Sequence, residues 1–151
     1  METIENAAGN IFREIRRVEI YRSENLSYID NFQKKKPSGA AVLEIKNIIP
    51  EDFDRSIKRK TTGGNTFFDI EISLSSYDVD PENINKLNNL LNDKDFVAVF
   101  YSNMDYTVLG NHTEPLEIFV LDNRKYNDSG NDLVTISITG STKVIPFVCP
   151  L

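Results

Sequence analysis

The residue types that most often carry out chemistry are scarce in this chain of 151 residues. It has one histidine, His112, and one cysteine, Cys149. A zinc site normally needs three or four nitrogen and sulfur ligands, which these two residues cannot supply. Nucleophilic catalysis with a histidine base would also depend on His112, and no nucleophile elbow or Cys-His pairing signal surrounds it. We therefore expect no catalytic residue, no metal site and no cofactor, with His112 solvated in a polar loop.

Two further patterns superficially suggest ligand binding. Gly63 and Gly64 follow Lys60, but the order of a phosphate-binding loop is missing and the segment leads into a strand. Asp69 and Glu71 share the polar face of one expected strand and could hold a cation, although a solvated strand face is the more common explanation. The oxygen-rich stretch 122–132 lacks the ligand spacing of a calcium-binding EF-hand.

Alternation of polar and apolar residues predicts a half-buried antiparallel strand over Thr66–Tyr77. A helix is predicted over Pro81–Asn92, because Asp80 is a typical N-cap and proline is favoured at the first helical position. The next segment, Phe96–Tyr101, is apolar throughout, which is typical of a strand covered on both faces. The helix packed over one side of a sheet would provide one of these covers.

The remaining chain adds further strands. A turn after Phe96–Tyr101 predicts a hairpin with Tyr106–Leu109, and Leu116–Asp122 and Leu133–Thr139 are joined by a polar tip. Ala40–Ile49 also alternates like a strand. The fold class is therefore mainly β with one or two helices (α+β), an antiparallel β-sandwich or barrel with a helix packed on one side.

The N-terminal part is harder to assign. Ile11, Ile15 and Val18 have helical spacing within Ile11–Arg22, although residues 18–21 also alternate like a strand. Residues 23–39 are polar and end in turn-forming residues, so they predict a loop or arm. We expect a single domain over residues 1–151, with a helix or arm at 1–39 and a β-sandwich core at 40–151.

The net charge of −6 is unevenly distributed. Residues 1–60 hold 12 Lys and Arg against 10 Asp and Glu, a balance of +2, whereas residues 61–151 hold 5 against 13, a balance of −8. This distribution argues against a general nucleic-acid binder, whose affinity comes from many phosphate-neutralising cations. No apolar run approaches the roughly 20 residues that span a bilayer, and the first ten residues lack signal-peptide order. The lone cysteine fits a reducing compartment.

The segment Asp54–Asn65 is unusually basic. It contains Arg55, Lys58, Arg59 and Lys60, followed by the glycine pair, and is expected to be an exposed loop or hairpin tip. It has little aromatic content, so a stacking platform for single-stranded nucleic acid is not indicated. A cationic loop that contacts an acidic surface of a neighbouring subunit fits the charge asymmetry and would fix the stacking direction.

The order of elements in residues 66–148 resembles that of the tail-tube-like and neck-ring structural proteins of double-stranded DNA bacteriophages, especially phages and prophages of Bacteroides-type hosts. The matching features are a long strand (FFDIEISL, 67–74), the helix starting at Pro81 (DPENINKLNNLLND), the apolar strand 96–101, the signature Leu109-Gly110 followed by Glu114-Pro115-Leu116, a closing strand (LVTISITG, 133–140) and an apolar end containing Pro146. The resemblance covers a little over half of the chain, and residues 1–50 match nothing in it.

The resemblance implies a non-enzymatic virion protein, a ring-forming subunit of the tail (tube, hub or neck/connector), assembled in the host cytoplasm. Its partners would be copies of itself in a closed ring, hexameric or dodecamer-related, and neighbouring tail or neck proteins. DNA would pass through without specific binding, and no membrane would be involved. The ring-stacking loop would be formed by Arg55, Lys58, Arg59, Lys60, Gly63 and Gly64, and the lumen acids would include Asp69 and Glu71.

The alternative is a β-sandwich module for ligand binding or adhesion. In that case aromatic residues near the strand ends would form a ligand patch: Tyr101, Tyr106, Phe119 and Tyr126. We also take Pro115 and Leu116 to be structural, with Leu116 in the core, and expect Gly110 and Gly140 to relieve backbone strain at strand ends.

Overall fold

The computed structural model describes residues 1–5, 13–77, 80–127 and 132–151. Within these ranges the chain forms mainly antiparallel β-structure, together with two α-helices and two short 3-10 turns. The strands are β1 (Ile15–Arg22), β2 (Leu43–Lys46), β3 (Asp54–Thr62), β4 (Asn65–Ser76), β5 (Asp93–Ser102), β6 (Asp105–Leu109), β7 (Leu116–Asp122), β8 (Val134–Thr142) and β9 (Val148–Pro150). The helices are α1 (Tyr28–Phe32) and α2 (Pro81–Leu90), and the 3-10 turns are η1 (Ser23–Asn25) and η2 (Pro50–Asp52).

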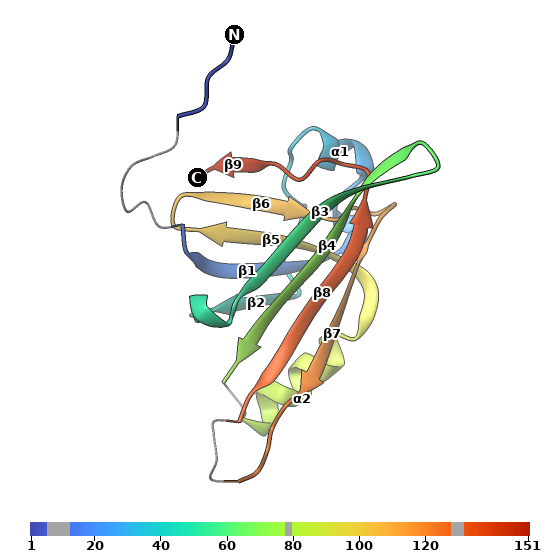
Figure 1. Ribbon diagram of the computed structural model, residues 1–151. Coiled ribbons are helices and arrows are strands. Elements are labelled where there is room, and N and C mark those ends of the chain that lie inside the picture. Colours follow the sequence, from blue (N-terminus) through green and yellow to red (C-terminus); the bar gives the residue numbers. More distant parts are fainter. Residues whose placement is uncertain (6–12, 78–79, 128–131) are drawn as a thin grey trace.

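The strands form one sheet with the order β2-β1-β5-β7-β8-β4-β3; β6 branches from β5, and β9 pairs with β6. The branch occurs because β5 is long: one side pairs with β1, while the other pairs first with β7 and then with β6. In Figure 1, β1, β2, β5 and β6 run across the molecule, whereas β3, β4, β7 and β8 run diagonally. The sheet therefore curls into a half-barrel, with β2 and β3 at the two ends of its hydrogen-bonded order.

The core lies inside the curl. Alternate residues of β4 point inward, as the sequence predicted, and Ile70, Ile72 and Leu74 are at most 2% exposed. Phe96 from β5 and Leu116 from β7 join the same buried cluster, as do Ile84 and Leu87 of α2. The apolar face of each amphipathic element is thus buried in one continuous cluster.

The helix predicted over Ile11–Arg22 is wrong for its described part, because residues 15–22 form β1. Val18 and Ile20 point into the core and are fully buried, while Arg17 and Glu19 lie on the outer face. Short segments can fit both a helical and an alternating pattern, and here the antiparallel pairing with β5 decides. Residues 6–12 lie outside the described residues.

Residues 23–39, predicted as a loop or arm, pack over the outer face of β5. Leu26 is 1% exposed and forms a second cluster with residues from the outer side of the sheet: Val97, Val99, Tyr101 and Val108. The prediction that β5 is covered on both faces is confirmed, but the outer cover comes from the N-terminal segment. Helix α2 instead contributes to the inner cluster.

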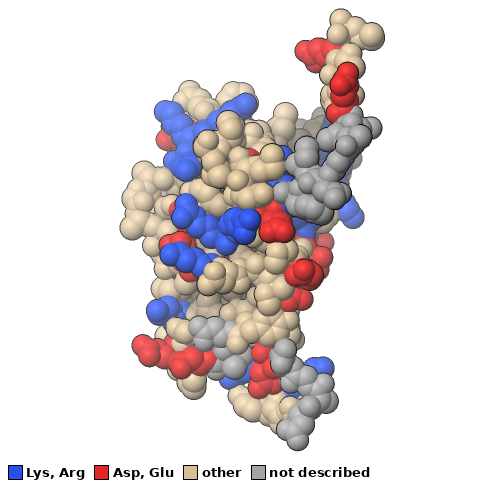
Figure 2. Space-filling view, turned by 90° about the vertical axis from the view of Figure 1, so that its left-hand side faces the viewer, with Lys and Arg blue, Asp and Glu red and all other residues tan. Residues whose placement is uncertain are grey.

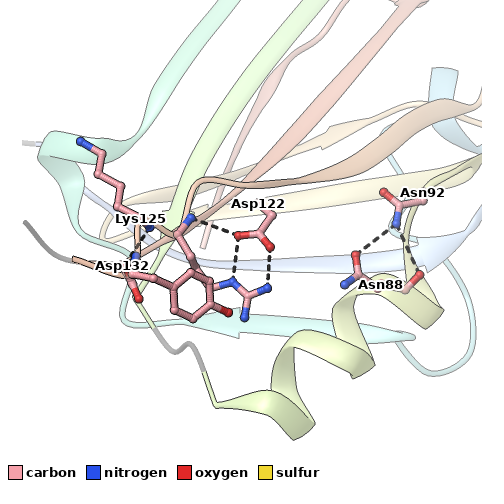
Figure 3. A network of polar contacts seen from close by, with 7 residues as sticks. Asn88, Asn92, Asp122, Lys125 and Asp132 are labelled. Carbon is pink, nitrogen blue, oxygen red and sulfur yellow. Dashed lines mark hydrogen bonds and ion pairs between the residues drawn. The ribbon is translucent and has the colours of Figure 1, made fainter.

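Helix α2 begins where the sequence predicted. The Asp80 carboxylate accepts the Glu82 backbone N–H at 2.9 Å, and Pro81 occupies the first helical turn. The helix ends before Asn92, which has a positive φ of 68° and donates its backbone N–H to the Ile118 carbonyl. The Asn92 side chain accepts the Val120 N–H at 2.8 Å and contacts Asn88 at 3.4 Å (Figure 3). Asn92 therefore both stops the helix and ties the start of β5 to β7.

The other predicted strands are present with changed ends. The strand over Leu116–Asp122 and the hairpin of β5 with β6 are confirmed. The strand expected over Ala40–Ile49 is shorter, and the last strand runs through Thr142. The antiparallel β class with helices is established, and the sheet is a curled half-barrel.

Candidate assembly surface

The basic segment Asp54–Asn65 is mainly a strand. It forms β3 and turns at Gly63 and Gly64, whose φ angles of 58° and 80° suit glycine. The prediction of an exposed loop is therefore wrong for residues 54–62, while the predicted hairpin tip is correct. The strand could not be recognised from an apolar pattern, because β3 is an edge strand in which no residue is fully buried and only Ser56 and Ile57 are half-buried.

The β3–β4 hairpin extends beyond the rest of the sheet. The last residue of β4 that pairs with β8 is Phe68, opposite Thr142. Beyond that level the two strands of the hairpin pair only with each other, up to Thr62 opposite Asn65. Figure 1 shows this tip projecting at the upper right. The hairpin thus presents both an open strand edge and a free tip, the features through which sheets of neighbouring subunits can pair.

The four basic residues of the hairpin lie on two different faces. Arg55 is opposite Ile72 and Arg59 is opposite Phe68, so both share the concave side with the core residues of β4. Lys58 is opposite Asp69, and Lys60 is opposite Phe67, on the convex side. The sequence grouped these cations into one patch, whereas strand alternation separates them into two pairs.

Asp69 is already paired within the subunit. Its carboxylate contacts the Lys60 Nζ at 2.5 Å and accepts the Ser141 hydroxyl at 2.6 Å. The hydrogen bonds from Lys60 and then Ser141 lower the pKa of Asp69, and Asp69 in turn raises the pKa of Lys60. Glu71 lies on the same convex face, is exposed, and borders a shallow hollow between β3, β4 and β8. The two predicted lumen acids therefore share a face but differ in local charge balance.

On the concave side, Arg55 reaches the mouth of the half-barrel. There it lines a cavity with Arg13 and Asp105, which sequence reasoning missed because they are 92 positions apart. Asp105 is 8% exposed; its carboxylate contacts Arg13 and accepts the Ser102 hydroxyl at 2.8 Å. Partial burial lowers the pKa of the Arg55 guanidinium, although Asp105 opposes the shift. No residue spacing in the sequence signals this group.

The signature segment Leu109–Leu116 has a structural role, in which two glycines leave room for the side chain of Leu116. Gly110 has a φ of 85°, and a Cβ there would lie 2.9 Å from Leu116 Cγ. Gly140 has no such backbone angle, but its Cβ would lie 2.8 Å from Leu116 Cδ2, so its expected role in relieving strain is replaced by close packing. Leu116 is 1% exposed, which confirms its predicted place in the core.

A network of hydrogen bonds around Asn111 holds the connection between β6 and β7. The fully buried Asn111 accepts the backbone N–H groups of Thr113 and Glu114 at 3.0 and 2.9 Å. Its amide nitrogen donates to Asn31 of α1 at 3.3 Å. The Glu114 carboxylate accepts the Lys143 backbone N–H at 2.8 Å, beyond the end of β8. The signature therefore joins α1, β7 and β8, and its polar residues are engaged in this structural role.

The aromatic residues considered for a ligand patch do not all gather. Tyr101 and Tyr106 are neighbours, with ring centroids 6.0 Å apart. Tyr101 is buried, however, and Arg17 and Lys36 lie over its ring at 4.1 and 5.0 Å. Tyr126 belongs to the segment after β7, at the lower end in Figure 1. An open aromatic platform built from this set is absent from the described residues.

The oxygen-rich stretch after β7 is occupied by internal contacts (Figure 3). Arg124 binds both carboxylate oxygens of Asp122, which lowers the pKa of Asp122 to about 2. Asp132 accepts the backbone N–H groups of Lys125 and Tyr126 at 2.9 and 3.2 Å. Residues 128–131 of this stretch lie outside the described residues.

Across the described ranges, no three His, Cys, Asp or Glu side chains converge as a metal site would require. The His112 side chain is exposed, and its backbone N–H donates to the Leu26 carbonyl. No helix in the part of the chain that the structure describes is both long and apolar enough to cross a membrane.

Comparisons with known proteins give no further assignment: no protein-family model, no curated protein and no solved structure matches this chain.

Proposed function

We propose that this protein is a non-enzymatic structural subunit of a bacteriophage tail or neck, and that it assembles into a closed ring around the DNA passage. The finer fold assignment that goes with this proposal is a β-sandwich or barrel of the tail-tube type. The observation that carries the proposal is the β3–β4 hairpin, a nine-residue edge strand continued by a tip that no other strand pairs with in the described sheet. The order of elements in residues 66–148 supports the same assignment.

The physical reason is that rings need heterologous contacts that close by rotation. An open edge strand offers unpaired backbone groups to a neighbour, and charged side chains on it restrict pairing to a complementary partner. Lys58 and Arg59, on opposite faces of the hairpin, are both exposed and available for such contacts. The acidic majority of residues 61–151 supplies the complementary charge on the next subunit.

The acidic residues of this half would also line the passage, where they would let DNA slide without phosphate contacts. Glu71 suits this role better than Asp69, because Lys60 already balances the charge of Asp69. Replacing Glu71 with glutamine in an assembled particle should slow DNA ejection, and unchanged ejection would remove Glu71 from the channel.

The first test is the mass of the purified protein by light scattering on a sizing column, with negative-stain images of any large peak. We expect rings or stacked tubes. The variant K58Q/R59Q should lower the assembled fraction without changing the free energy of unfolding, since both side chains are exposed and neither replacement places a second carboxylate opposite Asp69. K125Q, in the exposed segment after β7, is the matched control and should assemble normally.

A monomer at every concentration, also when mixed with candidate tail or neck proteins, would contradict the ring proposal. It would favour the alternative, a ligand-binding or adhesion module. In that case the cavity at the mouth of the half-barrel would be the place to search for a ligand, because the aromatic set does not form a platform.

A further inference from the structure

The mouth of the half-barrel contains a cavity with an apolar floor and a basic rim. Its volume is about 270 Å³. Phe53, Phe100 and Val148 supply apolar lining, and the rings of the two phenylalanines lie with centroids 6.2 Å apart. Arg13 and Arg55 supply the cationic lining. Figure 2 shows the molecule from the left-hand side of Figure 1, where basic side chains lie in separate groups and the group near the middle stands beside acidic side chains.

The charges of the cavity are not balanced. Asp105 is nearly buried and is occupied by Arg13 and Ser102. The Arg55 side chain is exposed and makes no hydrogen bond or ion pair within the described residues, although Asp105 acts on it electrostatically. Because Asp105 is already engaged by Arg13, the Arg55 guanidinium retains donors for a further carboxylate.

The size of the cavity points to a peptide side chain. Small-molecule sites usually enclose roughly 300–1,000 Å³, so this cavity lies just below that range. It can hold one branched apolar side chain over the phenylalanine rings, with a neighbouring carboxylate at the rim. The occupant should therefore be a short segment that combines an aliphatic residue with acids.

The N-terminal segment of this chain has that composition. Residues 1–5 read Met-Glu-Thr-Ile-Glu, with Ile4 between two acids. All five are exposed, and Ile4 is 93% exposed, so its side chain is available to be buried against another surface. Figure 1 shows this segment lying away from the sheet.

We propose that residues 1–5 of one copy dock into the mouth cavity of a second copy, with Ile4 over Phe53 and Phe100 and an arm carboxylate on Arg55. This inference rests on the proposed self-assembly and specifies one of its contacts. The docked arm would bury Ile4 and pair Arg55 in the same step, and both groups are exposed in the single subunit.

Disulfide trapping between copies tests the proposal. Cys149 is replaced by serine in every chain, so that the introduced thiols are the only ones. One chain carries I4C and a second, tagged chain carries V148C, on the lining of the cavity. We expect a mixed I4C–V148C dimer under mild oxidation. I145C, which is 65% exposed, is the accessible control and should give little dimer.

The dependence on charge is tested with R55E in the V148C chain. Loss of this charge pair should reduce the trapped dimer about tenfold or more, and E2R/E5R in the I4C chain should restore it. Equal trapping by V148C and I145C, or no effect of R55E, would overturn the proposal. A chain with both I4C and V148C that closes only on itself would overturn exchange between copies in favour of docking within one chain.

This experiment separates the two proposals. Rings without the I4C–V148C cross-link would leave the ring proposal intact and reject the arm contact. Cross-linked pairs that never form rings would support the arm contact and reject the ring proposal.

Discussion

The β3–β4 turn and the β6–β7 connection both contain glycines with positive φ, but the surroundings of these glycines differ. In the β3–β4 turn, nothing lies within 4 Å of a Cβ added at Gly63 or Gly64. In the connection from β6 to β7, a Cβ at Gly110 would press on Leu116 at 2.9 Å. The first turn projects into solvent, and the second is packed into the core and closed by the buried Asn111.

The two connections therefore have different roles: the β6–β7 connection stabilises the subunit, and the β3–β4 turn is available for contacts with other molecules. The packed connection stabilises the subunit, since its side chains have the burial and hydrogen bonds that make substitutions costly. The tip of the projecting β3–β4 hairpin contributes little to the core of the single subunit. Its exposed residues are therefore free to contact neighbouring subunits. Three predictions test this contrast, from the largest expected effect to the smallest.

Replacing Leu116 with alanine should have the largest effect. Leu116 is 1% exposed and packs against two glycines, so the variant loses apolar burial and leaves a cavity. We expect the free energy of unfolding to fall by about 2–5 kcal/mol, measured by urea denaturation. The control L121A, on the same strand but 47% exposed, should stay within about 0.5 kcal/mol of the wild type. Equal losses in the two variants would break the contrast.

Replacing Asn111 with alanine should have an intermediate effect. The variant leaves the backbone N–H groups of Thr113 and Glu114 without their acceptor and Asn31 without its donor. We expect a loss of about 1–3 kcal/mol in the free energy of unfolding. H112A is the neighbouring control, because its side chain is exposed and its backbone bond to Leu26 is retained. A loss in H112A as large as in N111A would place the stabilising contact elsewhere.

The Lys60–Asp69 pair of the hairpin should have the smallest effect. The pKa of Asp69 is lower in the folded state than its ordinary value, so the folded protein binds fewer protons on this group than the unfolded chain does. The pair therefore stabilises the fold above the ordinary aspartate pKa of about 3.9, and this contribution is lost as the pH falls through the lowered pKa.

Urea denaturation between acidic and neutral pH measures this contribution. D69N should weaken the dependence of unfolding on pH at low salt, and the difference should fade at high salt because exposed pairs are screened. K60M alone should weaken the pH dependence less than D69N does, because Ser141 still lowers the pKa of Asp69, and adding K60M to D69N should change nothing further. A D69N chain with the full wild-type pH dependence would show that the pair does not form in solution.

Much of the C-terminal half could be predicted from local pattern. The alternation in β4, the Asp80-Pro81 helix start and the fully apolar β5 each depend on residues a few positions apart. The exposed turn at Gly63 and Gly64 was likewise predictable from residue type. The basic segment was misassigned because an edge strand in solvent does not need the apolar alternation that marks a half-buried one.

The sequence by itself determined the antiparallel β class, the helix at Pro81 and the scarcity of catalytic side chains, since these follow from composition and short-range spacing. Only the tertiary structure decided that residues 15–22 form a strand, that Leu26 covers β5, and that Arg55 faces Asp105 while Lys60 faces Asp69. The physical reason is that each of these outcomes depends on a partner distant in sequence, or on which face of a strand points into the curled sheet. Strand pairing sets both of these, and no local pattern encodes them.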